Sequence, residues 1–491
     1  MKGSQPEKTT AARDRATSRR SLLRQMAGMS LALPLAGAGL PLVSGLSSAG
    51  AQGEQEQEQQ PPAGPAPLPE PGSLTAQDDA FLNQLEQASY LFFWEQGNPL
   101  TGLVKDRCNT RANDTSIVAS VASTGFGLTA ICIAHARGFV SHEDARLRVV
   151  RTLAFLWHKL PTHRGFFFHF ANINTGERVW DSEVSSIDTA LLLCGVLTCK
   201  AHFAQDRDII ALAHAIFDRV DWSWIAEDTS ILSMGWTPEY GFLPSRWGDY
   251  SELMMIYLLA MGSGTHPLAS NTWDAWKRTI FEYDGLRYIG SFAPLFVNQY
   301  SQAWFDFRNK RDRYADYFHN SVIATDAHRL FCLSLNEKFP DYTNAMWGIT
   351  ASDSKDGYVV WGGPPATGPI DGTVVPCAAG GSLPFLPAAT MRVLNTIHDH
   401  YPGAWSRYGF VDAFNPLTNW YDTDVIGIDV GITMLMAENA RSGFVWETFM
   451  KNPEAQRGMA KAGFAPYTPQ SPEGKPAGSA PANPAGKVRS K

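Results

Sequence analysis

The chain has 491 residues, a formal net charge of −7 at pH 7 and a pI near 6.0. This acidic balance argues against a nucleic-acid partner, for which a basic surface is expected. Hydrophobic residues make up 44% of the chain and aromatic residues 12%, so the length and composition allow a large core in one or more domains.

The first 51 residues resemble a twin-arginine export signal. Ser18-Arg19-Arg20-Ser21-Leu22-Leu23 is followed by an apolar run from about Met26, and Ala49-Gly50-Ala51 fits a cleavage site. A membrane anchor is the alternative, but the short, Gly/Ala-rich run and the cleavage site favour removal. We therefore expect the twin-arginine export machinery as a partner and a periplasmic or secreted location.

The globular region is expected between two low-complexity segments. Residues 52–73 are rich in Gln and Glu and then in Pro, and residues 456–491 are rich in Pro, Gly and Ala. Such compositions cannot bury a core, so both are predicted to be disordered. One globular domain is predicted over 74–455.

Helical patterns dominate this domain. Thr75-x-x-Asp78 resembles a capping box before a stripe of Phe81, Leu85 and Phe92. Further helices are predicted over 116–137, 141–160, 182–203, 206–220, 251–261, 270–282, 311–336, 385–400 and 428–451. Gly165-Phe-Phe-Phe-His-Phe and Gly357-Tyr-Val-Val-Trp suggest short hairpin strands.

These elements predict an all-α fold of paired helices closed into an α/α barrel, with aromatic-rich loops and minor β-hairpins. The loops at one end would then build the functional site. A bundle or a helical solenoid is the alternative, but no fixed-period repeat is present.

The six cysteines are Cys108, Cys132, Cys194, Cys199, Cys332 and Cys377. They form no CxxC or Cys/His metal signature, and Cys194 and Cys199 sit in an apolar helical pattern. Buried thiols are the favoured interpretation. One or two disulfides in an oxidising compartment are the alternative.

The most informative stretch runs from Met234 to Met255. It sets three carboxylates, Glu239, Asp249 and Glu252, among aromatic residues that include Trp236 and Tyr250. Aromatic rings stack on the apolar faces of sugars, and a carboxylic acid among apolar groups gains the raised pKa of a general acid. Glu252 is therefore predicted to be a catalytic acid, with service at a helix N-terminus as the alternative.

Three other polar clusters could supply its partners. The first contains Asp106 and Arg107, for which a solvated loop is the alternative. The second contains Glu183 and Asp188: capping is the alternative for Glu183, whereas Asp188 is predicted to point inward from the middle of a helix. The third contains Asp412 and the candidate site residues Trp420, Asp422 and Asp429.

No metal or cofactor is expected. Asp422-x-Asp424 suggests calcium, but no complete calcium loop is present. The histidines His169, His266 and His328 lack the spacing of metal ligands, and no nucleophile elbow, P-loop or dinucleotide fingerprint appears in a supporting context.

Several long segments, in order over about 80–450, resemble the glucoamylase-like family. They begin at Ser182 (Ser-Glu-Val-Ser-Ser-Ile-Asp), Met234 (Met-Gly-Trp-Thr-Pro-Glu), Gly262 (Gly-Ser-Gly-Thr-His-Pro), Pro294 (Pro-Leu-Phe-Val-Asn-Gln-Tyr-Ser), Trp347 (Trp-Gly-Ile-Thr-Ala-Ser-Asp), Asp371 (Asp-Gly-Thr), Tyr408 (Tyr-Gly-Phe-Val-Asp-Ala-Phe-Asn) and Gly427 (Gly-Ile-Asp). That family includes endo-β-1,2-glucanases of glycoside hydrolase family 144. The resemblance implies an (α/α)6 barrel and hydrolysis of β-1,2-glucan, with inversion in family 144 and retention in related cyclising domains.

The resemblance also implies roles for individual residues. Glu252 matches the family's proposed acid, and Glu183 and Asp429 compete as the second catalytic carboxylate. Asp188, Asp429 and Trp236 match cleft or supporting positions of the family. The full set of predicted substrate-binding residues is Asp106, Arg107, Asp188, Trp236, Glu239, Tyr250, His266, Gln299, Tyr300, Trp420 and Asp422. Asn298 and Gln302 stand where relatives often have His, and Val430-Gly431-Ile432 replaces Gln-Gly-Pro, so subsite contacts are expected to differ.

The sequence therefore predicts an exported, monomeric glycoside hydrolase that acts on a glucan oligo- or polysaccharide and needs no cofactor. Two other functions are compatible with the same scaffold: a non-catalytic periplasmic glucan-binding protein and a polysaccharide lyase. A lyase that binds polyanions requires a basic cleft, which the acidic clusters disfavour.

Overall fold

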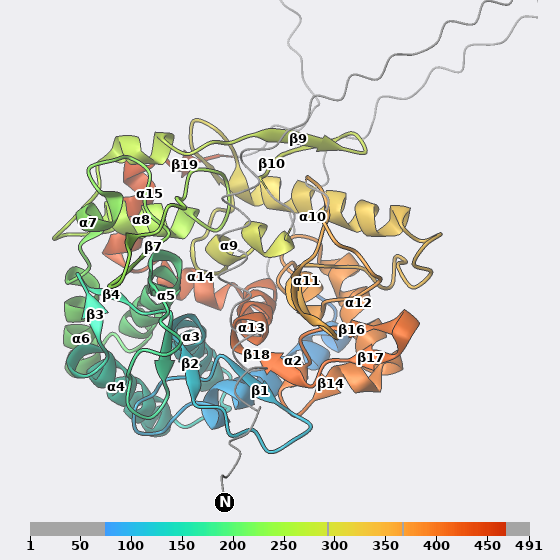
Figure 1. The fold of residues 1–491 in the computed structure, drawn as a ribbon, viewed down its shortest axis with the longest axis horizontal. Coiled ribbons are helices and arrows are strands. Elements are labelled where there is room, and N and C mark those ends of the chain that lie inside the picture. Colours follow the sequence, from blue (N-terminus) through green and yellow to red (C-terminus); the bar gives the residue numbers. More distant parts are fainter. Residues whose placement is uncertain (1–73, 292–293, 366–367, 468–491) are drawn as a thin grey trace, which may run out of the picture.

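The computed structural model describes residues 74–467, apart from 292–293 and 366–367 (Figure 1). The predicted signal peptide, the predicted linker and the last part of the predicted tail lie outside the described residues. Helices dominate the described part of the chain, and each of its strands is short. None of the described helices combines the length and the apolar character needed to cross a membrane.

The core is built from helices that are buried on almost every side. They are α3 (Val121–Ala136), α5 (Ser186–His202), α8 (Met254–Gly262), α9 (Tyr300–Trp304), α11 (Pro376–Gly380) and α13 (Gly427–Arg441). Nearly all of their residues are buried and most are apolar or small, so these helices are not amphipathic; the exceptions are buried charged residues near the ends of α5 and α13. They form the inner layer of the barrel.

The outer layer consists of helices that bury one face. They are α2 (Ala76–Glu95), α4 (His142–His158), α6 (Arg207–Asp218), α10 (Tyr317–Ser334) and α12 (Pro387–His400). The capping box at Thr75 and Asp78 that begins α2 is confirmed. Inner and outer helices alternate along the described chain from α2 to α8 and again from α9 to α13, in agreement with the predicted α/α barrel.

Shorter helical segments complete the described chain. They are α7 (Trp222–Ala226), α14 (Phe444–Phe449), α15 (Pro453–Lys461), η1 (Ser270–Asp274), η2 (Leu295–Asn298), η3 (Pro402–Ala404) and η4 (Pro416–Thr418).

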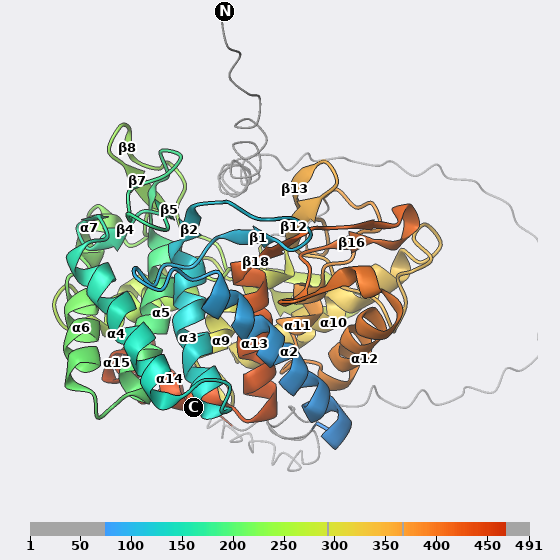
Figure 2. The ribbon, with the colours of Figure 1, turned by 90° about the horizontal axis from the view of Figure 1, so that it is seen from below.

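The strands that matter for the site gather at one end of the barrel (Figure 2). They pair antiparallel: β1 (Arg107–Asn109) with β18 (Asp424–Ile426), β2 (Val118–Ser120) with β5 (Phe170–Asn172), β6 (Val184–Ser185) with β7 (Gly235–Thr237), β7 with β8 (Gly241–Phe242), β12 (Ala351–Ser354) with β13 (Gly357–Val360), and β16 (Phe414–Asn415) with β17 (Trp420–Tyr421). Several of them lead directly into inner helices. This end therefore collects the N-termini of α3, α5 and α13.

The remaining pairs are also antiparallel and short. They are β3 (Thr162–His163) with β4 (Phe166–Phe167), β9 (Ile280–Tyr283) with β10 (Leu286–Ile289), β14 (Trp405–Ser406) with β15 (Gly409–Phe410), and β11 (Lys310–Arg311) with β19 (Ala465–Pro466).

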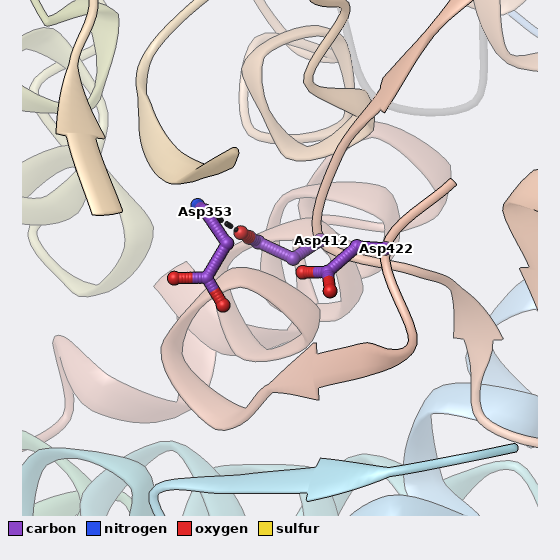
Figure 3. A group of neighbouring side chains, drawn as sticks. All are labelled: Asp353, Asp412 and Asp422. Carbon is purple, nitrogen blue, oxygen red and sulfur yellow. Dashed lines mark hydrogen bonds between the residues drawn. The ribbon is translucent and has the colours of Figure 1, made fainter. Parts of the chain in front are cut away.

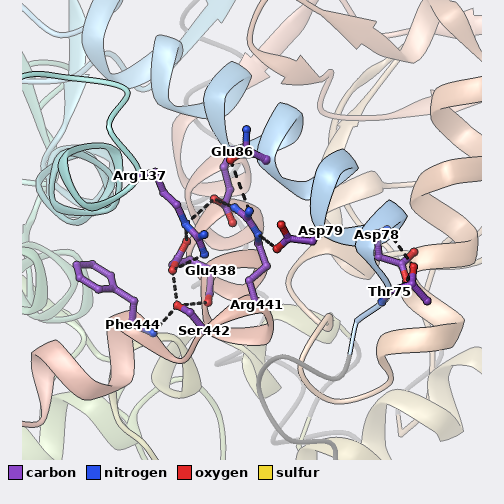
Figure 4. Close-up of polar contacts among 10 residues, drawn as sticks. Thr75, Asp78, Asp79, Glu86, Arg137, Glu438, Arg441, Ser442 and Phe444 are labelled. Atoms are coloured by element: carbon purple, nitrogen blue, oxygen red, sulfur yellow. Dashed lines mark hydrogen bonds and ion pairs between the residues drawn. The ribbon is translucent and has the colours of Figure 1, made fainter.

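Close packing and ion pairs hold the inner helices together. α3 and α5 approach so closely that a Cβ on Gly195 would lie 2.1 Å from the carbonyl oxygen of Gly125. At the C-terminal ends of α3 and α13, Arg137 pairs with Glu438 (Nε–Oε2, 2.7 Å), and Arg441 pairs with the fully buried Glu86 of α2 (Nη1–Oε2, 2.5 Å) (Figure 4). This network fixes the end of the barrel opposite the strands.

Three predicted elements differ from the structure. The helix predicted over 270–282 is the short η1 followed by β9, since the segment pairs as a hairpin with β10. The helix predicted from 182 begins at Ser186, because the preceding residues pair with β7 as strand β6. The folded region also extends beyond 455, because α15 packs on α8 and β19 pairs with β11.

Candidate active site

Three of the predicted catalytic carboxylates lie close to the N-termini of inner helices. Glu183 precedes β6 and α5, Glu252 lies two residues before α8, and Asp429 is the third residue of α13. All three side chains are buried. The unpaired N–H groups and the dipole of a helix N-terminus favour a negative charge. They therefore reduce the free-energy penalty of burying three carboxylates at this end of the barrel.

A histidine joins Glu183 to Asp188. His169 Nδ1 lies 3.0 Å from Glu183 Oε1, and its Nε2 lies 3.5 Å from Asp188 Oδ1. The hydroxyl of Ser185 donates to Asp188 Oδ2 (2.6 Å), and the imidazole stacks on Phe170 with ring centroids 3.8 Å apart. The imidazole therefore orients Glu183 from a fixed position. Asp188 lies in the first turn of α5 rather than mid-helix as predicted, because α5 begins later than expected.

The segment that carries Glu252 is anchored on the start of α5. Trp247 Nε1 donates to Ser186 Oγ (2.8 Å), and the Ser186 hydroxyl in turn donates to the carbonyl of Met234 (3.0 Å). The Glu252 carbonyl accepts from the Ser301 hydroxyl (2.8 Å), which ties the same segment to α9. These buried hydrogen bonds hold the Glu183 and Glu252 segments against each other.

Aspartates from three hairpins meet on the other side of this end (Figure 3). Asp353 on β12, Asp412 after β15 and Asp422 after β17 each offer a carboxylate oxygen, and these oxygens lie within 4.8 Å of one another. Burial, followed by the neighbouring carboxylates, raises the pKa of Asp412 well above its usual range and that of Asp422 to about 7. Arg107 Nη1 contacts Asp353 Oδ2 at 2.5 Å and lies 3.9 Å from Asp424 Oδ2.

Asp429 adjoins this aspartate group. The Cys377 thiol donates to Asp429 Oδ1 (3.3 Å), and burial, together with Asp429 and Asp412, raises the pKa of the Cys377 thiol well above its usual range. A small cavity lies here, lined partly by these three side chains.

Some predicted substrate-binding residues lie at the rim of this end. Trp236 on β7 is half-buried and stacks face to face on His163, with ring centroids 4.0 Å apart. Glu239, in the turn between β7 and β8, forms two hydrogen bonds with Arg178 (2.6 and 3.0 Å). Trp420 on β17 is also half-buried. Asp106 accepts from Arg107 Nε (3.1 Å), so both members of the first predicted cluster join the aspartate group.

Other predicted substrate-binding residues lie in the core. Tyr250 is fully buried and stacks parallel to Tyr317, with ring centroids 6.3 Å apart. Gln299 Nε2 donates to the Ala378 carbonyl (3.0 Å) and ties α9 to α11, and Tyr300 packs edge-on against Phe126. In the described structure these three side chains are buried, so they support the residues that line the site.

His266 is not brought to the site. It follows Gly262, the last residue of α8, and therefore lies at the opposite end of that helix from Glu252. Its Nδ1 lies 3.8 Å from Asp221 Oδ1, an ion-pair distance. Its role in substrate binding stays a prediction from the sequence. The motif that suggested it supports the C-terminal end of the helix.

Sequence reasoning missed four residues of this end: His169, Arg178, Asp353 and Cys377. Asp353 ends a segment that carries the family resemblance, and this could have identified it. No sequence pattern identified His169, because Glu183 and Asp188 come close to it only when the chain folds and β5 and β6 are formed. The cysteines are free and buried in the described structure, as predicted, and none is disulfide-bonded.

The comparisons with known proteins agree with this architecture. The Glycoamylase family model matches residues 244–453. An exo-β-1,2-glucooligosaccharide sophorohydrolase (non-reducing end) of Parabacteroides distasonis is 28% identical over 423 residues, which are 78% of this chain and 58% of that relative. The chain thus spans less than two thirds of that relative's length.

Two solved structures share the fold over most of the chain. The endo-β-1,2-glucanase from Chitinophaga pinensis, in complex with sophorotriose and glucose, is 27% identical with a TM-score of 0.74 and covers 80% of this chain and 99% of its own. A β-1,2-glucanase from Parabacteroides distasonis is 25% identical with a TM-score of 0.73 and covers 79% of this chain and 60% of its own. With the alternation of inner and outer helices, the fold shared with these solved structures confirms the prediction of an all-α (α/α)6 barrel. Family match, sequence and fold together show that this chain is similar to proteins of the glucoamylase-like family.

Proposed function

We propose that this protein is a glycoside hydrolase that cleaves β-1,2-glucan. The observation that carries the proposal is the position of Glu183, Glu252 and Asp429, three buried carboxylates close to the N-termini of α5, α8 and α13 at one end of the barrel. Glycoside hydrolysis requires one carboxylic acid that protonates the leaving oxygen and a second carboxylate that acts as base or nucleophile. This end of the barrel supplies both.

The choice of substrate rests on the relatives. Both the P. distasonis sophorohydrolase and the C. pinensis endo-glucanase are named for activity on β-1,2-linked glucose. The mouth of the site offers apolar ring surface for a sugar chain, at Trp236 and Trp420 and at Tyr240, which is 89% exposed in the turn between β7 and β8. Rings of this kind pack on the apolar faces of pyranoses.

Glu252 is proposed as the acid. Its segment is fixed by the bonds of Trp247 and Ser301 described above, so the carboxyl is presented from a rigid support, as positioning of a catalytic proton requires. Glu183, oriented by His169, and Asp429, contacted by the Cys377 thiol, are the two candidates for the second carboxylate. The separation of the acid from its partner would determine whether the anomeric configuration inverts.

The test compares wild type with Glu252→Gln on linear β-1,2-glucan, with reducing ends as the readout. Removal of a general acid is expected to lower kcat by about 10²–10⁴-fold with an unchanged fold. Glu282→Gln is the matched control, since Glu282 lies on β9 with a side chain that is 64% exposed. Near-normal turnover by Glu252→Gln would remove this residue from the acid role, and tight binding without turnover by wild type would identify a binding protein instead.

We also propose that the protein is exported as a folded monomer. The support is the sequence around Arg19 and Arg20, with its apolar run and cleavage site. The test is fractionation of cells that express wild type or Arg19→Lys/Arg20→Lys, followed by size-exclusion chromatography of the mature form. A cytoplasmic location of wild type, or an unchanged distribution of the variant, would contradict twin-arginine export.

A further inference from the structure

The aspartate group of Asp353, Asp412 and Asp422 has a feature that hydrolysis does not explain. In each carboxylate one oxygen is held in place. Asp353 Oδ2 accepts from Arg107, Asp412 Oδ2 accepts from the Asp353 backbone N–H (2.6 Å), and Asp422 Oδ1 accepts from the backbone N–H groups of Thr423 (2.7 Å) and Asp424 (3.2 Å). The three carboxyl groups are therefore oriented before any ligand arrives.

The second oxygen of each carboxylate has no partner. Among the described residues, no hydrogen-bond donor reaches Asp353 Oδ1, Asp412 Oδ1 or Asp422 Oδ2, and all three atoms are buried. The residues are only 4%, 3% and 8% exposed. A buried carboxylate oxygen without a donor is costly, and buried charges are normally paired or bound to a metal ion.

Nearby cations do not balance this charge. In the described part of the chain, Arg107 is the cation within 4.0 Å of Asp353, and it also contacts Asp106 and Asp424. No lysine or arginine of the described residues lies that close to Asp412 or Asp422, and Asp429 adds a further negative charge beside Asp412. One guanidinium thus faces several carboxylates in a buried space.

We propose that Asp353, Asp412 and Asp422 bind a divalent cation, and that this cation is Ca²⁺. Their oxygens lie within 4.8 Å of one another, and two ligands on opposite sides of a calcium ion are about 4.6–5.2 Å apart at Ca–O distances of about 2.3–2.6 Å. Mg²⁺ requires a tighter octahedron, with opposite ligands about 4.2 Å apart. Calcium also tolerates irregular geometry, which suits ligands that come from three separate hairpins.

The bound ion would add a link among three hairpins, of which the Asp412 and Asp422 segments are already joined by a backbone hydrogen bond from Asp422 N–H to the Ala413 carbonyl (2.9 Å). Asp353 comes from β12, Asp412 follows β15 and Asp422 follows β17. All three positions adjoin Arg107 or Asp429 of the candidate active site. Calcium would therefore stabilise this wall of the site. Binding itself is independent of the proposed hydrolase activity.

The experiment uses the mature protein after treatment with EDTA and dialysis. Isothermal titration with CaCl₂ is expected to show one site per chain, and the melting temperature is expected to rise with calcium concentration, because a ligand that binds the native state stabilises it. MgCl₂ is the comparison. An equal response to Mg²⁺ would overturn the assignment to calcium, and absence of a bound ion at millimolar calcium would overturn the site.

Variants locate the ion. Asp412→Asn keeps the shape of the side chain and removes one charged ligand, so calcium affinity is expected to fall at least tenfold. Asp356→Asn is the matched control, because Asp356 is exposed in the turn of the β12–β13 hairpin that carries Asp353. Unchanged affinity of the Asp412 variant would place the ion elsewhere and overturn the proposal.

A measurement on wild type alone avoids dependence on the folding of a variant. Tb³⁺ replaces Ca²⁺ and luminesces when a nearby tryptophan is excited. Trp361 donates to Ser352, next to Asp353, and Trp420 lies two residues before Asp422. Sensitised emission that added Ca²⁺ displaces is expected, whereas absence of emission would overturn the site.

Discussion

Replacement of Arg107 by methionine would test whether this one guanidinium holds the acidic wall of the site together. Arg107 lies 2.5 Å from Asp353 Oδ2, 3.1 Å from Asp106 Oδ2 and 3.9 Å from Asp424 Oδ2. Its side chain is 19% exposed and that of Asp353 is 6% exposed, so the central pair is largely desolvated.

Removal of one partner from a buried ion pair costs about 3–5 kcal/mol because the other charge stays buried and unpaired. The partial exposure of the Arg107 side chain, 19%, places the expected loss at the lower end of this range. We expect Arg107→Met to lower the free energy of unfolding by about 3 kcal/mol. In Arg107→Met/Asp353→Asn, part of this loss is expected to return, since the unpaired charge is removed as well.

The assay is urea unfolding at pH 7 followed by tryptophan fluorescence, in EDTA so that no divalent ion contributes. Arg287→Met is the matched control: Arg287 lies 3.8 Å from Glu282, both side chains are more than 60% exposed, and such pairs contribute about 0–1 kcal/mol. A loss below about 1 kcal/mol for Arg107→Met, or a double variant with additive losses, would refute the reasoning.

Three further predictions concern other parts of the fold. Burial, and then the neighbouring His135, lower the pKa of His202 from 6.5 to about 4. The free energy of unfolding is therefore highest above pH 6.5 and falls by up to about 3 kcal/mol as the pH drops through 4, because the folded state resists protonation of this imidazole. The melting temperature of His202→Gln should depend less on pH over this range. Gly195→Ala should lower the free energy of unfolding in urea by about 1–3 kcal/mol, although alanine has the better helix propensity, because the alanine Cβ would meet the Gly125 carbonyl. An unchanged urea midpoint would show that α3 and α5 can move apart without cost. Trp236→Ala should raise KM for glucan more than it lowers kcat, because it removes ring surface at the mouth; an unchanged KM would exclude Trp236 from binding.

The layers of the barrel could be predicted from the sequence because they depend on local patterns. The stripe of α2 and its capping box at Thr75 and Asp78 lie within one segment, as does the cap at Ser141 that begins α4. The start of α5 could not be predicted in the same way, since Val184 pairs with Trp236, which lies 52 positions further along the chain. A strand of two residues carries no periodicity that identifies it.

The site was predictable in part for the same reason. Glu183, Glu252 and Asp429 stand beside apolar helical runs, and this local signal identified them as carboxylates at helix starts. The aspartate group is different: Arg107 and Asp353 are 246 positions apart, and only the folded hairpins bring them together. His266 follows α8, and its Nδ1 lies 3.8 Å from Asp221 Oδ1, so its motif is not placed beside Glu252 by the helix start that positions that carboxylate.

The most direct test of the central claim is the initial rate of reducing-end release from linear β-1,2-glucan, measured beside β-1,3- and β-1,4-glucans at equal concentration. We predict release from the β-1,2-linked polymer, with rates on the other two lower by orders of magnitude, and loss of that release in Glu252→Gln. Release from no glucan, or equal rates on all three linkages, would contradict the account.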